Sequence, residues 1–231
     1  MNKSRYYNNK ILIIVYRAVA IILGTYGVLE ILGVFSRNIK LVSLMTFTVQ
    51  SNILVIVLFV ILLIKTILYK DGDSKSEKPF GFFPRASAFI AFAISVTMMV
   101  YWAILLPSNF DSIGLAGMFE FNNLTMHLLV PLFMIVDYIL FNERGQLKKY
   151  DPFLCIIIPY IYMVEVLPLG AMRLISFDSI GIHSHYPYIF LDIDKFGAGV
   201  ILMVVGITLF FIIAMTIWQR IDNKLAKKAN R

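Results

Sequence analysis

The sequence predicts an all-α membrane protein in which six transmembrane helices form a single bundle over residues 1–231. Hydrophobic residues make up 59% of the 231 residues, and the mean hydropathy is +0.80. Soluble globular domains are only about 45–50% apolar. Six segments are apolar over the roughly 20 residues that a helix needs to cross a bilayer. Such a bundle uses nearly the whole chain and leaves no room for a separate soluble domain.

Each apolar segment is separated from the next by a polar or turn-forming stretch. The first follows a basic start without a small-residue cleavage site, so we expect a helix rather than a signal peptide. The second is long enough to tilt, and Pro84 suits the first turn of the third. A basic tail follows the sixth. The expected spans are about residues 11–35, 41–69, 84–106, 119–141, 152–175 and 196–218.

The distribution of Lys and Arg predicts the orientation of the bundle. Sixteen of the 21 basic residues flank one side, which carries both termini, the polar connection at residues 70–79 and the short basic connection at residues 142–151. Four lie on the other side, and Arg17 lies within the first span. The positive-inside rule then makes both termini cytoplasmic.

The net charge of +7 fits a protein whose main partner is the lipid bilayer. Nucleic acid is not expected as a partner, because no basic stripe carries interleaved aromatic residues. The single cysteine, Cys155, excludes internal disulfides, CxxC redox chemistry and a thiolate metal cage.

The expected fourth span carries a histidine. His127 is the only histidine in an apolar run, and an ionisable group at membrane depth marks a functional site by default. In the predicted topology, the polar stretch at residues 46–52 of the second span lies at the same depth. Helical spacing places Thr48, Ser51 and Asn52 on one face, Thr46 and Gln50 on another, and Asn123 on the face of His127.

A threonine that faces a histidine can carry covalent catalysis. A neutral imidazole can take the proton of the hydroxyl and later protonate the leaving group. Amides such as Gln50, Asn52 or Asn123 could orient the histidine or stabilise an oxyanion. The alternative is structural, because hydroxyls in membrane helices often bond to their own backbone or join helices. Spacing alone leaves both interpretations open.

Other charged residues are expected on the same side of the membrane. Glu30 lies near the outer end of the first span, Glu165 is nearer mid-depth in the fifth, and Arg173 closes the fifth. Glu165 is a candidate proton-relay or orienting group. The alternative is a structural partnership that satisfies its burial.

The loop at residues 176–195 is rich in aromatic and acidic residues. His183, His185, Asp192 and Asp194 are metal-ligand types, but His-x-His in a loop is a weak signal, and we expect no metal and no cofactor. The alternative is an interfacial loop with aromatic side chains at headgroup level, for which the candidates are Tyr186, Tyr188 and Phe190, with Trp102 on the third span.

Three motifs together resemble a family. They are Phe-Thr-x-Gln-Ser-Asn at residues 47–52, Asn-x3-His-x3-Pro at residues 123–131 with Asp137 after it, and Tyr-Pro-Tyr-x-Phe-Leu-Asp at residues 186–192. In order and spacing they are similar to a bacterial family of six-span membrane proteins of largely unknown function. That family is distantly similar to the androgen-induced and androgen-dependent membrane hydrolases, which cleave fatty acid esters of hydroxy fatty acids with a threonine and a histidine.

The resemblance implies a catalytic pair. It places the histidine at His127 and the threonine at Thr48, with Thr46 as a second possible register. This chain departs from the eukaryotic enzymes at residues 50–52 and in its loops, so the fold and the pair carry over better than the substrate does.

We therefore predict an intramembrane lipid-ester hydrolase that needs no cofactor and acts on a lipid or fatty-acyl ester. Its expected place is the bacterial plasma membrane, with the site toward the outer leaflet, between the second and fourth spans and under the 176–195 loop. The alternative is a small non-enzymatic binding, transport or accessory protein in which Glu30, Glu165 and Arg173 handle a ligand or protons.

Overall fold

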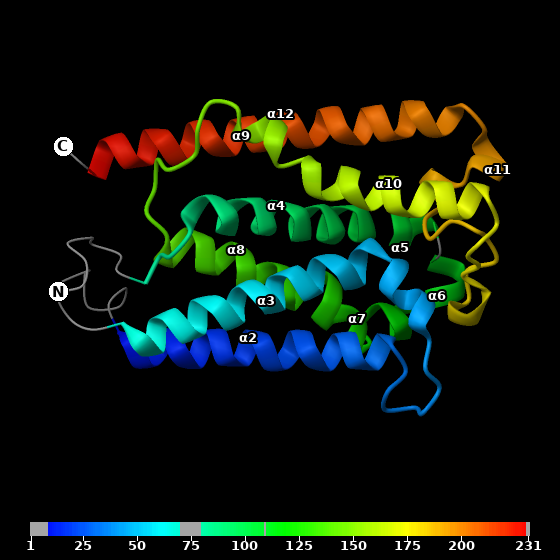
Figure 1. Ribbon diagram of the computed structural model, residues 1–231, viewed down its shortest axis with the longest axis horizontal. Coiled ribbons are helices and arrows are strands. Elements are labelled where there is room, and N and C mark those ends of the chain that lie inside the picture. Colours follow the sequence, from blue (N-terminus) through cyan, green and yellow to red (C-terminus); the bar gives the residue numbers. More distant parts are fainter. Residues whose placement is uncertain (1–8, 70–79, 109, 230–231) are drawn as a thin grey trace.

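The computed structural model describes residues 9–69, 80–108 and 110–229. Every regular element in these ranges is helical. Six helical segments among them are long and apolar enough to cross a membrane, and they lie side by side in one elongated bundle (Figure 1). This confirms the predicted fold class, and the protein is an integral membrane protein.

The six spans are built from helices that are partly interrupted. The first two are α2 (Lys10–Ile31) and α3 (Phe47–Leu68), with the 3-10 helix η1 (Leu41–Met45) between them. The third comprises α4 (Pro84–Val100), the π-helix η2 (Tyr101–Leu105) and α5 (Leu106–Ser108). After α6 (Phe110–Met118), the fourth comprises α7 (Phe121–Leu124), the π-helix η3 (Thr125–Leu129) and α8 (Val130–Phe141). The fifth comprises α9 (Asp151–Leu154) and α10 (Ile157–Ala171), and the sixth is α12 (Gly199–Ala229). Between them lie η4 (Asp178–Ile180), η5 (Ile189–Leu191) and α11 (Ile193–Phe196).

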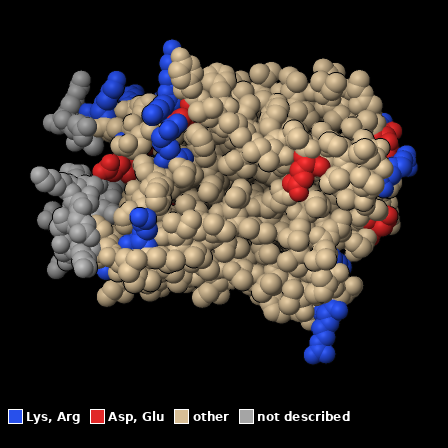
Figure 2. Space-filling view, viewed as in Figure 1, with Lys and Arg blue, Asp and Glu red and all other residues tan. Residues whose placement is uncertain are grey.

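The start of α2 and the end of α12 lie at the same end of the bundle, as an even number of spans requires (Figure 1). Most of the Lys and Arg side chains visible in Figure 2 gather at this end, beside a broad surface almost free of charge. The predicted polar connection at residues 70–79 lies outside the described residues. That this end is cytoplasmic stays a prediction from the positive-inside rule.

The first two spans are shorter at the opposite end than expected. The first helix ends at Ile31 rather than near residue 35, because Gly33 adopts a left-handed φ of 74° in a tight turn. A Cβ at Gly33 would lie only 1.9 Å from the backbone oxygen of Asn38, so the turn needs glycine. The second helix begins at Phe47 rather than near residue 41, because Thr46 caps it by accepting a hydrogen bond from the backbone N–H of Val49.

The last two spans also differ from their expected bounds. The fifth ends at Ala171 rather than near residue 175, and Arg173 follows it with a left-handed φ of 57°. The sixth begins at Gly199 and continues through the basic tail to Ala229, well beyond the expected end near residue 218. The tail therefore extends the last helix past the length that the lipid requires.

A buried ion pair fastens α2 to α8. Arg17 Nε lies 2.8 Å from Asp137 Oδ1, and both side chains are fully buried. The remaining guanidinium N–H groups donate to Asp137 Oδ2, Thr66 Oγ1 and the backbone oxygens of Leu62 and Phe80. All five donors of the arginine are therefore satisfied, which is the condition for holding such a charge inside a membrane bundle.

Candidate active site

Thr48 and His127 meet between the second and fourth spans. Thr48 lies in the first turn of α3, and its Oγ1 is 3.5 Å from Nε2 of His127 in η3. This separation is at the outer limit of a hydrogen bond, a range common in catalytic pairs that hold no substrate. The two residues that were predicted to share a depth thus face each other directly.

Pro131 explains why His127 lies in a π-helix. Pro131 has no N–H with which to bond the carbonyl four residues earlier, which is that of His127. The N–H of Val130, just before the proline, bonds to the carbonyl of Thr125, five residues earlier rather than four, and this widens the turn. The carbonyl of His127 accepts a hydrogen bond of 2.9 Å from Nε1 of Trp102. The proline of the His-x3-Pro motif therefore releases a carbonyl that ties the histidine backbone to the third span.

The third span has a matching π-helix at the same place. In η2 the N–H of Leu106 bonds to the carbonyl of Tyr101, and Pro107 follows. This turn presents Tyr101 to the histidine, and the two rings are stacked with centroids 3.7 Å apart and planes 15° apart. π-helical turns occur frequently at functional sites, because they re-aim side chains within a helix.

The hydrogen bonds around His127 define its tautomer. Nδ1 lies 2.8 Å from Oδ1 and 3.2 Å from the backbone oxygen of Asn123, both of which are acceptors. The amide of Asn123 is oriented by its Nδ2, which donates to the backbone oxygens of Gly117 and Met118. Nδ1 must therefore carry the proton, and in the neutral ring Nε2 has the free lone pair that faces Thr48.

Tyr188 reaches Thr48 from the loop between the last two spans. The backbone N–H of Thr48 donates to the Tyr188 hydroxyl at 3.1 Å, and that hydroxyl lies 3.4 Å from Thr48 Oγ1. Burial raises the pKa of Tyr188, so its hydroxyl keeps its proton. Because Thr48 lies at the N-terminus of α3, its backbone N–H also belongs to the positive end of a helix dipole.

An apolar pocket begins at Thr48 and runs away from His127. It is lined by α3, α4, α10, α12 and the η5 loop. Thr48, Phe92, Met163, Tyr188 and Phe211 are among its wall residues, and none of its wall residues is charged. The expected pocket between the second and fourth spans is therefore wrong in position: Thr48 lies between the histidine and a pocket that extends toward the third, fifth and sixth spans.

The other polar residues of residues 46–52 mostly hold the helices around Thr48. Thr46 donates to the Ser43 carbonyl at 2.8 Å while it caps α3. Ser51 Oγ is 2.7 Å from Thr97 Oγ1 on α4. Asn52 Nδ2 donates to the carbonyls of Thr48 and Met126, which ties α3 to η3.

Gln50 connects α3 to the fifth span. Its Nε2 donates to Glu165 Oε2 at 2.9 Å and to the carbonyl of Leu44 at 3.1 Å. Glu165 therefore has a specific partner near the site, as its structural interpretation expects. Glu30 is half-buried near the end of α2.

The candidate residues of the 176–195 loop do not meet at Thr48. Arg173 is exposed and lies 3.8 Å from Asp194. His183 Nδ1 is 2.9 Å from Asp178, and hydrogen bonds from Ser176 and His183 lower the pKa of Asp178. His185 Nδ1 is 2.6 Å from the carbonyl of Ile175, and Asp192 caps α11. Within residues 9–69, 80–108 and 110–229, no three His, Cys, Asp or Glu side chains are grouped so that they could hold a metal ion.

The aromatic residues of this loop pack inward. Tyr186 is 1% exposed and lies against Gly170, where an added Cβ would be 2.6 Å from the ring and 2.7 Å from the backbone oxygen of His185. The ring of Tyr188 stacks on that of Phe190, and both residues line the pocket. The loop is thus a cover over the site.

Replacing Gly170 by alanine is expected to loosen this cover. The new methyl group would overlap the tyrosine ring and a backbone oxygen, and such overpacking typically costs about 1–3 kcal/mol. Thermal unfolding and limited proteolysis of the loop measure the effect. Gly206→Ala on α12 is the matched control, since no atom lies within 4 Å of its added Cβ. Equal stability of the two variants would show that the Gly170 contact does not hold the loop.

Four residues around the pair were not assigned there from the sequence. Trp102 and Tyr188 were expected only as interfacial aromatic residues, and Tyr101 and Thr97 were not singled out. Pro107 and Pro131 were the available signal, because each proline marks a point where the preceding turn is disturbed.

No protein-family model, curated protein or solved structure matches this chain.

Proposed function

We propose that the protein is an intramembrane hydrolase of lipid esters, of the type that cleaves fatty acid esters of hydroxy fatty acids, with Thr48 as nucleophile and His127 as general base. The observation that carries the proposal is the position of Thr48 Oγ1, between the unprotonated Nε2 of His127 and the end of an apolar pocket. A nucleophile that contacts a base on one side and lines an apolar pocket on the other is suited to attack an acyl ester.

The first half-reaction acylates Thr48. The hydroxyl proton passes to His127 Nε2 as Oγ1 bonds to the ester carbonyl carbon, and the carbonyl oxygen becomes an oxyanion. The tetrahedral centre then expels the alcohol oxygen, which takes the proton from Nε2. Asn123 keeps the Nδ1 proton in place throughout, because Nδ1 faces acceptors alone.

The second half-reaction releases the acid. Water gives a proton to His127 Nε2 and its oxygen bonds to the acyl carbon, after which Oγ1 leaves and recovers that proton. The products are the alcohol component and the carboxylic acid, and no cofactor takes part in these steps.

The proposed donor to the oxyanion is the hydroxyl of Tyr188. It accepts the hydrogen bond from the backbone N–H of Thr48, lies 3.4 Å from Oγ1, and keeps its proton because burial raises its pKa. Donors fixed in a site from which water is excluded stabilise developing charge strongly.

Tyr188→Phe is therefore expected to lower kcat about 10²-fold, with a smaller effect on KM, because the lost hydrogen bond strengthens only in the transition state. Steady-state hydrolysis by the purified protein measures both constants. Tyr69→Phe is the control, since Tyr69 follows the far end of α3 and packs on Phe80. A rise in KM without loss of kcat would assign Tyr188 to substrate binding instead.

The proposed location is the bacterial plasma membrane with the site toward the outer leaflet. Thr48 lies near the end of the bundle opposite to the start of α2 and the end of α12, and the basic residues favour a cytoplasmic position for that other end.

Hydrolysis by the purified protein in lipid nanodiscs tests the function. We expect release of fatty acid from long-chain hydroxy fatty acid esters, and no release from amides of the same chains. If neither class is cleaved by folded protein, the alternative interpretation as a binding or transport protein is favoured.

A further inference from the structure

The fifth and sixth spans form the most open side of the bundle. Only 22% and 17% of the residues in their most apolar windows are buried, against 50% for the third span. A groove lies between α10 and α12, and Met163, Leu167, Ile201 and Val204 are among its walls. None of the residues that line it is charged. The groove therefore faces the region that the hydrocarbon of a membrane would occupy.

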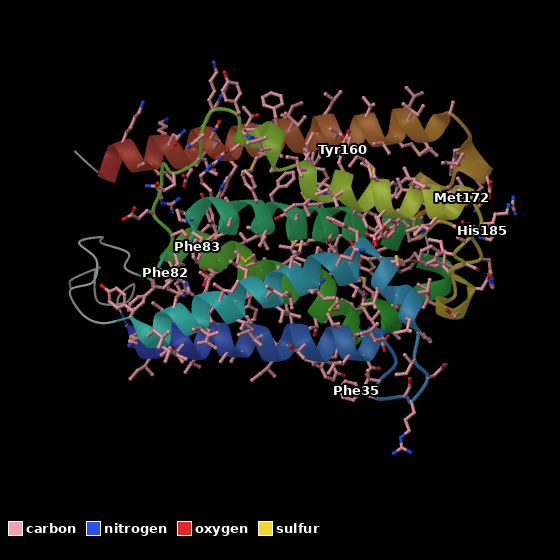
Figure 3. The ribbon with its side chains drawn as sticks, in the orientation of Figure 1. Phe35, Phe82, Phe83, Tyr160, Met172 and His185 are labelled. Carbon is pink, nitrogen blue, oxygen red and sulfur yellow. The ribbon has the colours of Figure 1, made fainter. Side chains whose placement is uncertain are left out.

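This groove adjoins the pocket at Thr48. Tyr160, Met163 and Val204 line both, so the two spaces adjoin at these shared walls. Tyr160 lies between α10 and α12 (Figure 3), with its hydroxyl 3.1 Å from Thr208 Oγ1. Thr208 lines the pocket but not the groove. The hydrogen bond between these hydroxyls thus lies at the junction and links the two helices across it.

We propose that the groove between α10 and α12 is the portal through which one acyl chain of a membrane lipid passes sideways to Thr48. Both spaces are apolar and without charged walls, so they fit a hydrocarbon chain and not a headgroup. The occupant is identified by continuity, because the groove opens toward lipid at one side and adjoins the pocket of the nucleophile at the other. That the acyl chain belongs to a substrate rests on the proposed function. That an acyl chain binds in the groove and pocket does not.

Photo-crosslinking of the inactive Thr48→Ala protein in nanodiscs tests the portal directly. The probe is a long-chain fatty ester with a diazirine near the end of its chain, which stays intact because the nucleophile is absent. We expect crosslinks to Val96 or Ile207, which line the pocket but not the groove, and competition by excess unlabelled ester. Probe dissolved in the bilayer labels the outer surface of any membrane helix, so labelling of the pocket is the informative readout.

A plug and its control locate the path. Val204→Trp fills the shared wall, whereas Leu202→Trp adds the same ring two residues away at a position that is 76% exposed and lines neither space. The plug is expected to lower pocket crosslinking about tenfold or more. Even one extra methylene in a well-defined apolar site typically changes binding by about 10- to 200-fold. The control is expected to give the same pocket crosslinking as the Thr48→Ala protein without an added tryptophan.

Equal crosslinking in Val204→Trp and Leu202→Trp would overturn the portal, whatever the catalytic activity. Turnover gives an independent readout in the active protein. The plug should raise KM for a long-chain ester far more than Leu202→Trp does. Saturable pocket labelling in a protein that hydrolyses no ester would keep the portal and remove the hydrolase function.

Discussion

Thr48→Val and His127→Ala are each expected to lower ester hydrolysis roughly 10³-fold or more while the protein still folds and inserts. Valine has nearly the shape of threonine, so the first change removes the hydroxyl and little else. The second removes the base whose Nε2 lies 3.5 Å from that hydroxyl. Steady-state hydrolysis by purified variants of matched thermal stability measures the loss.

The double variant is expected to be no worse than either single one, because the two groups act as a unit. Thr46 provides the control for the nucleophile. Its hydroxyl caps α3, so Thr46→Ala should cost about 1 kcal/mol of stability and reduce turnover far less than Thr48→Val does. If Thr48→Val kept wild-type turnover, the pairing would be wrong. Loss in Thr46→Ala alone would move the nucleophile to Thr46.

Asp137→Ala is expected to destabilise the protein by about 3–5 kcal/mol, because it leaves the fully buried guanidinium of Arg17 without its counter-charge. Thermal or denaturant unfolding in detergent measures the change. The double replacement Arg17→Met with Asp137→Leu should recover most of that stability, since it removes both charges and keeps the volume filled.

An exposed ion pair provides the comparison. Arg173 and Asp194 are 3.8 Å apart, with side chains 67% and 53% exposed, so Arg173→Ala should change stability by no more than about 1 kcal/mol. Similar losses in Asp137→Ala and Arg173→Ala would contradict the structural importance given to the buried pair.

The fold and two contacts of the site follow from the sequence. Segment length and composition predict six spans, and six are present in the described residues. Depth and helical spacing predict that Thr48 and Asn123 can approach His127, and both do.

The position of the pocket was not predictable in the same way. α10 and α12 are apolar around most of their circumference, so their sequences do not reveal which face borders a cavity. The π-helices were also hidden, because one extra residue in a turn leaves an apolar run unchanged. The contact between Arg17 and Asp137 joins residues 120 positions apart, and nothing local in either span indicates its partner.

Covalent labelling with a fluorophosphonate probe tests the central claim most directly. The folded protein in detergent is treated with the probe, and the modified residue is mapped by mass spectrometry. We predict a label on Thr48 that is lost in His127→Ala, because the hydroxyl reacts only when Nε2 can take its proton. Absence of any label on folded wild-type protein, or an equal label on Thr48 in His127→Ala, would contradict an activated threonine in this site.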